Sequence, residues 1–169
     1  MGEMAKKIVK TDLEHLVKIL NEAYAEEWLA YYQYWIAAKI AMGLGRSEVI
    51  AEFEEHATEE LKHANWLADR IIQLGGTPIL NPSEWNQLAH CKYMTPHDFD
   101  VVALVKDNLE SERCAIGRYE GICDLTHGTD YETFRLSRKI LKEEIEHEQE
   151  MEDFMADFET AKQYIKGEL

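Results

Sequence analysis

Two short segments of the chain carry a glutamate followed three residues later by a histidine. They are Glu60 and His63 in EELKHA, and Glu144 and His147 in EEIEHE. Side chains at positions i and i+3 of a helix lie on one face, so each pair can bind one metal ion. Carboxylate and imidazole donors without thiolate favour iron or manganese over a structural zinc site. We therefore predict a metal centre that uses both pairs.

Two further glutamates stand where a helix would otherwise present apolar residues to a core. Glu27 continues the stripe of Leu20 and Ala23, and Glu112 follows Leu109, in each case at a spacing of three or four residues. Such spacing is typical of the buried face of a packed helix. We expect both carboxylates to face inward, together with the two Glu-x-x-His pairs.

The register of these residues repeats along the chain. Glu27 precedes Glu60 by 33 positions, and Glu112 precedes Glu144 by 32. Each half therefore places a core glutamate on one helix and a core Glu-x-x-His pair on the next. Four buried carboxylates repel one another and lose hydration, at a cost of several kcal/mol per ion. Two divalent cations would cancel the four charges; proton uptake, or polar pairing without metal, is the alternative.

Four long helices must position these side chains, which predicts an all-α protein. A first pair of helices is expected from about Thr11 to 43–45 and from Ser47, as N-cap, to 75–76. A second pair is expected from just after Thr95, with Pro96 in the first turn, to near Gly128 and from about Asp130 almost to the C-terminus. Short links make the members of each pair antiparallel neighbours.

The link from Gly75 to Thr95 is long, with one helical turn expected at SEWNQLA. At about 3.3 Å per residue it can cross the length of a helix. This predicts a four-helix bundle with one long crossover between the second and third helices, in a single domain of residues 1–169.

Composition limits the partners of this chain. A net charge of −15 opposes nucleic-acid binding, and only Lys6, Lys7 and Lys10 form a small basic arm. Contact with DNA is therefore expected to be weak or absent. The sequence shows neither a run of about 20 apolar residues nor a signal peptide, so no membrane span is expected. Three cysteines without a CxxC pair argue against a disulfide scaffold, which makes the cytoplasm the expected compartment.

These motifs resemble the ferritin-like superfamily over nearly the whole chain, whose di-iron and di-manganese members are known to use this ligand set. LNEAYAEEWLAYYQYW resembles the first helix of bacterioferritins and implies that Glu27 is a terminal ligand. EELKHA implies that Glu60 is the bridging carboxylate, with His63 beside it. The other ligands implied are Glu112, Glu144 and His147. Two iron ions per subunit are expected, with manganese as the alternative.

One position departs from the bacterioferritin pattern. Leu61 stands where bacterioferritins carry the methionine that ligates haem. The resemblance therefore does not extend to that ligand, and we do not expect haem.

A closer resemblance is to the Dps-like miniferritins called thioferritins, through Cys114 in ERCAI and Cys91 in HCKYMTP. It implies a redox-active cysteine pair beside the metals and assembly into a dodecamer. It also implies oxidation of Fe(II) by peroxide or oxygen, storage of ferric iron, and protection of DNA. Cys114 and Cys123 would lie about 13 Å apart along one helix, beyond disulfide reach. Cys91, on the crossover, can meet Cys114; the alternative is that all three are buried thiols.

Several assignments stay open at the level of sequence. Tyr34 and Tyr119 lie one or two turns from core glutamates, where they could hydrogen-bond to the ligands or simply fill the core. His56, His90 and His127 have no evident partner.

Other functions fit the same residues. One is a di-iron or di-manganese enzyme that stores nothing, such as a rubrerythrin-type peroxidase or a manganese catalase. The absence of a CxxC motif argues against a rubrerythrin-type peroxidase. Another is a helical module whose metals only stabilise the bundle.

Overall fold

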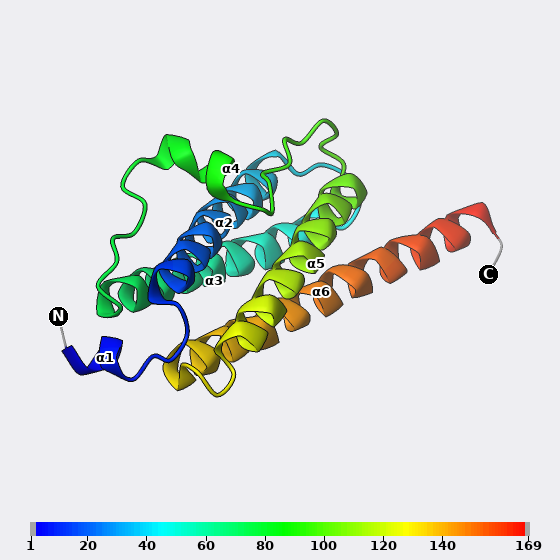
Figure 1. The fold of residues 1–169 in the computed structure, drawn as a ribbon. Coiled ribbons are helices and arrows are strands. Elements are labelled where there is room, and N and C mark those ends of the chain that lie inside the picture. The colour runs from blue at the N-terminus through cyan, green and yellow to red at the C-terminus, as the bar shows by residue number, and fades with distance from the viewer. Residues whose placement is uncertain (1–2, 168–169) are drawn as a thin grey trace.

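The computed structural model describes residues 3–167, which form long helices packed side by side (Figure 1). The long helices are α2 (Leu13–Ile40), α3 (Arg46–Gln73), α5 (Val101–Thr126) and α6 (Tyr131–Lys166). The short ones are α1 (Glu3–Lys7), the 3₁₀ turn η1 (Pro82–Glu84) and α4 (Trp85–Leu88). Over the described residues there is no strand, and no helix is apolar over enough length to cross a membrane.

The helices form two antiparallel hairpins, α2 with α3 and α5 with α6, joined by the crossover of residues 74–100 (Figure 1). The prediction of an all-α, four-helix bundle with one long crossover is therefore confirmed. The helical turn expected in SEWNQLA is also present, as η1 and α4.

Aspartates begin three of the long helices. The side chains of Asp12, Asp100 and Asp130 each accept a backbone N–H from the first turn of α2, α5 and α6. The prediction that Ser47 caps the second helix is wrong, because α3 already begins at Arg46. Gly45 precedes it with a φ of 77°, a left-handed conformation that favours glycine.

The predicted start of the third helix is also wrong. The helix begins at Val101, not after Thr95, and Pro96 lies outside it. Backbone hydrogen bonds hold the residues around the start of α5 against the link between α2 and α3. The Met42 N–H donates to the Phe99 carbonyl at 2.8 Å, and the Val101 N–H donates to the Met42 carbonyl at 2.8 Å. These tertiary bonds outweigh the local preference of proline for a first turn.

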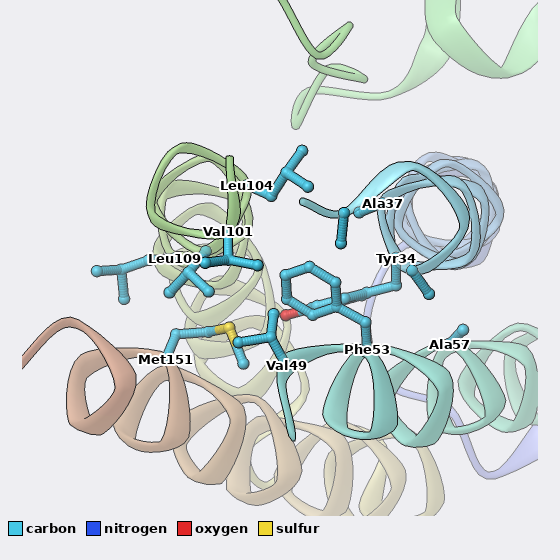
Figure 2. Packing of buried hydrophobic residues seen from close by; sticks show 12 residues of the cluster. Tyr34, Ala37, Val49, Phe53, Ala57, Val101, Leu104, Leu109 and Met151 are labelled. Carbon is cyan, nitrogen blue, oxygen red and sulfur yellow. The ribbon is translucent and has the colours of Figure 1, made fainter. Parts of the chain in front are cut away.

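The apolar core is divided into two clusters with a polar layer between them. On α2, Leu20 belongs to one cluster, Tyr34 to the other, and the buried Glu27 lies between. Figure 2 shows the second cluster, in which Phe53 of α3 packs against Tyr34 of α2, with ring centroids 5.5 Å apart. Packing on both sides keeps the intervening layer away from solvent. The C-terminal part of α6 extends beyond the rest of the bundle (Figure 1).

Candidate metal centre

The polar layer contains two overlapping groups of ligand atoms. One group comes from Glu27, Glu60, His63 and Glu144. The other comes from Glu60, Glu112, Glu144 and His147. Within each group, one ligand atom of every residue lies within 4.8 Å of the others. The structure thus brings together the six residues predicted as ligands, and two of them, Glu60 and Glu144, belong to both groups.

The two histidines turn the same ring nitrogen toward the carboxylates. His63 Nδ1 lies 3.2 Å from Glu27 Oε2 and 3.0 Å from Glu144 Oε1. His147 Nδ1 lies 3.4 Å from Glu60 Oε1. The six residues are each no more than 3% exposed, so the whole centre is enclosed by the bundle.

Several buried polar atoms in this layer make no hydrogen bond of normal geometry with the described residues, although oppositely charged groups lie close to some of them. They are Oε2 of Glu27, Oε1 of Glu60, both carboxylate oxygens of Glu144, and Nδ1 of His147. Buried polar atoms are normally satisfied, because an unpaired one costs free energy. Two divalent cations would use these lone pairs and cancel the charge of four carboxylates. The donor set therefore fits two ions of the iron or manganese type.

Proton positions in the metal-free centre follow from burial and charge. Burial, with nearby carboxylates, raises the pKa of Glu27 and of Glu112 well above the usual carboxyl range. Burial acts to lower the pKa of the imidazoles, but the close approach of the surrounding carboxylates outweighs it and raises the pKa of both His63 and His147. Protons thus neutralise part of the centre and must leave when metal binds.

A second pair of glutamates orients the two imidazoles. His63 Nε2 lies 2.8 Å from Glu143 Oε2 on α6, and His147 Nε2 lies 2.9 Å from Glu59 Oε2 on α3. Each contact fixes one ring and leaves its Nδ1 facing the ion positions. The sequence analysis did not identify Glu59 or Glu143. The available signal was the doubled glutamate that opens both motifs, EELKH and EEIEH.

Each of two buried tyrosines also contacts a glutamate of the other hairpin. Tyr34 lies seven residues after Glu27 but donates its hydroxyl to Glu112, and Tyr119 lies seven residues after Glu112 but donates to Glu27. Of the two roles left open for these tyrosines, the structure shows hydrogen bonding to the core glutamates. Burial and the adjacent carboxylate raise the pKa of each tyrosine, so each keeps the proton that it donates.

His56 also lies at this centre, so the expectation that it has no partner is wrong. Its ring stacks on His147 with centroids 4.0 Å apart, and its Nε2 lies 2.9 Å from Glu150. Burial and the adjacent His147 lower the pKa of His56 to about 4. Glu150 lies on α6, too far along the chain for sequence spacing to predict the contact.

A disulfide and hydrogen bonds hold the crossover next to the candidate metal centre. Cys91 and Cys114 form a disulfide with their Cα atoms 5.8 Å apart. Glu26 Oε1 accepts from the backbone N–H of His90 at 2.6 Å and of Cys91 at 3.3 Å, and pairs with Arg118 at 2.7 Å. The structure thus makes the pairing that was expected. A redox role for this pair stays a prediction.

A small cavity of about 20 Å³ separates the crossover from the ligands, which is room for one water-sized molecule. Its walls include Cys91, Tyr93 and all four glutamates of the candidate centre. Cys123 is buried and unpaired, and it does not line this cavity.

Two Glu and two Glu-x-x-His groups, held inside a bundle with one crossover, define a ferritin-like di-metal carboxylate protein. Residues 17–161 match the family described as Ferritin-like domain, and the chain belongs to that family.

Individual relatives agree with this assignment. The chain is similar to a dodecameric thioferritin, the bacterioferritin-related protein of Bacteroides fragilis, with 48% identity and a TM-score of 0.95 over 96% of this chain and 98% of that one. It is 37% identical to the DNA protection during starvation protein of Pyrococcus furiosus, over 92% of this chain and 86% of the relative. Dps from Thermosynechococcus elongatus, at 17% identity, shares the fold with a TM-score of 0.80 over 84% of this chain and 90% of its own.

Proposed function

We propose that this protein oxidises Fe(II) at a di-iron centre inside each subunit and stores the ferric product. The observation that carries this proposal is the pair of ligand groups that share Glu60 and Glu144. Shared carboxylates hold two ions side by side, so that one small oxidant can take an electron from each. Glu27 with His63, and Glu112 with His147, complete the two positions.

The substrates are Fe(II) and a small oxidant. Two Fe(II) ions supply two electrons, which with two protons reduce hydrogen peroxide to two water molecules or dioxygen to hydrogen peroxide. Transfer of both electrons together avoids the release of hydroxyl radical. The water-sized cavity against Cys91 and Tyr93 is also lined by the four candidate glutamates, and Tyr34 and Tyr119 hold Glu112 and Glu27 in place while the iron ions enter and leave.

We further propose that the protein assembles into a homododecamer. The Bacteroides fragilis relative is described as dodecameric. This chain also exposes apolar side chains that need partner surface. They include Leu44, on the link between α2 and α3, and Ile165, near the end of α6. Val102 at the start of α5 is exposed as well. Tyr32 and Trp35 are exposed on α2.

Protection of DNA completes the proposal, as the name of the Pyrococcus furiosus relative suggests. With a net charge of −15, this chain should protect DNA by removing Fe(II) and peroxide, in the cytoplasm, more than by covering the duplex.

Anaerobic loading tests the function. The metal-free protein is given two Fe(II) per chain, then peroxide, and ferric absorbance and particle mass are followed on one sample over repeated cycles. Rapid oxidation, accumulation of many ferric ions per chain, and a mass near twelve chains are expected. A protein that consumes peroxide but never holds more than two iron ions per chain would be a non-storing peroxidase or catalase, and storage would be rejected.

A further inference from the structure

A second set of ligand atoms lies just outside the di-metal centre, where α3 and α6 meet solvent. We propose that Glu52, His56 and Glu150 bind a third divalent cation, which waits there between solvent and the His147 side of the centre. This inference rests on the proposed function and adds to it a site for incoming or outgoing iron.

The three side chains already converge without a cation. His56 Nε2 lies 2.9 Å from Glu150 Oε2 and 3.3 Å from Glu52 Oε1, and one ligand atom of each lies within 4.8 Å of the others. His56 is 1% exposed, whereas the side chains of Glu52 and Glu150 are 28% and 47% exposed. A rigid, buried imidazole therefore faces two carboxylates that reach solvent. An ion arriving there can keep some of its water while it gains three protein ligands.

His56 also connects this outer set to the di-metal centre. His56, Glu112 and His147 form another group whose ligand atoms lie within 4.8 Å of one another. The outer set shares His56 with this group, and this group shares Glu112 and His147 with the di-metal centre. Neighbouring ligand sets thus overlap from the half-exposed carboxylates to the buried ions, so an ion can be passed inward without leaving all its ligands at once.

The opposite side of the centre supplies a built-in comparison. Helices α3 and α6 repeat the motif with an offset of 84 residues, from Glu60 to Glu144 and from His63 to His147. The same offset places three apolar residues opposite the outer set: Leu136 for Glu52, Ile140 for His56 and Trp66 for Glu150.

Side-chain packing follows that difference. Trp66 packs against His63 with ring centroids 5.5 Å apart, and Lys139 Nζ lies 3.4 Å from the centre of the Trp66 ring. Apolar groups therefore cover the His63 side, and the His147 side carries ligand atoms in the same places. An ordinary solvated helix face would not be expected to concentrate its ligands on one of two related sides.

Zinc binding tests the proposal without reliance on turnover. Zn(II) is titrated calorimetrically into the metal-free wild type, the double variant Glu52→Gln/Glu150→Gln, and the control Glu146→Gln. Glu146 lies one turn from Glu150, is exposed and pairs with Lys142, so the control changes charge on the same helix without touching the set. We expect three tight ions per chain in the wild type and the control, and two in the double variant. Anomalous diffraction from Zn(II)-soaked crystals should place the third ion between Glu52 and Glu150.

Two results would overturn the inference. One is a wild type that binds only two ions, with no anomalous peak at the outer set; the proposed function would then still stand, because the di-metal centre is filled. The other is a double variant that loses the third ion yet fills its di-metal centre with Fe(II) as fast as the wild type, which would reject the staging role. Failure of zinc at the di-metal centre itself would instead count against the proposed function.

Discussion

His63 on α3 and Glu143 on α6 are joined by a 2.8 Å contact between Nε2 and Oε2. His147 and Glu59 repeat this contact in the opposite direction at 2.9 Å. Each Glu-x-x-His helix therefore orients the histidine of the other. The two hairpins are tied together at the level where the ions are expected, and the geometry of each ion position depends on both hairpins.

Glu143 should act as a positioning residue. Glu143→Gln keeps an acceptor near His63 but removes the charge, so metal affinity is expected to fall by about 10- to 100-fold. The measurement is Co(II) or Zn(II) titration of the metal-free protein, with Glu146→Gln as the control for a lost surface charge. Equal affinities in Glu143→Gln and in the wild type would show that the contact does not tune the site.

Metal binding should release protons. The pKa of His63 and of His147 is raised by carboxylate partners, so both rings hold protons at neutral pH that metal must displace. Metal affinity is therefore expected to rise with pH. Calorimetry of Zn(II) binding in two buffers of different ionisation enthalpy measures the protons released. A binding heat that does not depend on the buffer would contradict this account.

The disulfide between Cys91 and Cys114 should stabilise the fold and respond to thiol reductants. It closes a loop with a sequence separation of 23 residues. Chain entropy predicts a contribution of about 3 kcal/mol to the free energy of unfolding. Reduction by dithiothreitol, which is itself oxidised, should lower the denaturant midpoint of the wild type. The variant Cys91→Ala/Cys114→Ala should already have the lower midpoint and show no response to reductant. If the reductant lowered the midpoint of that variant equally, the effect would not come from this disulfide.

A buried ion pair fastens the end of the molecule opposite the α2–α3 link. Arg70 donates to both oxygens of Asp130 at 2.8 and 2.7 Å. Asp130→Asn leaves the Arg70 charge unpaired and should cost about 3–5 kcal/mol of stability. The matched control is Glu132→Gln, whose pair with Arg135 is exposed and should matter little. Indistinguishable unfolding midpoints for the two variants would contradict this ranking.

The same pair sets a dependence on pH. Burial acts to raise the pKa of Asp130, but hydrogen bonds from Thr133 and Arg70 outweigh it and lower the pKa. The stabilisation should be complete above the unfolded pKa of about 3.9 and be lost as pH falls through the lower folded value. Asp130→Asn should lack this part of the acid sensitivity.

Sequence periodicity predicted the bundle and the burial of the six candidate ligands together, because core positions on a helix recur at three and four residues and an acidic residue there needs a partner. Glu59 lies about 100° around the helix from Glu60, so periodicity alone turns it away from the core. Only the approach of His147 from α6 makes it a partner. His56 was missed although spacing alone places it on the face of Glu60, four residues before it, and four residues after its partner Glu52. The start of α5 was misplaced because Met42 holds the preceding backbone. Contacts between distant segments decided the role of Glu59 and the start of α5, and spacing within one helix does not encode those contacts.

The most direct test of the account compares Fe(II) oxidation by peroxide in the wild type and in Glu60→Ala. Glu60 belongs to both ligand groups, so its loss should disable both ion positions at once. Two Fe(II) per chain are mixed anaerobically with each protein, peroxide is added in a stopped-flow instrument, and circular dichroism confirms that the variant stays helical. The predicted result is rapid oxidation in the wild type and in Glu146→Gln, with loss of the rapid phase in Glu60→Ala. Equal oxidation rates in the wild type and in a folded Glu60→Ala would contradict the di-iron centre.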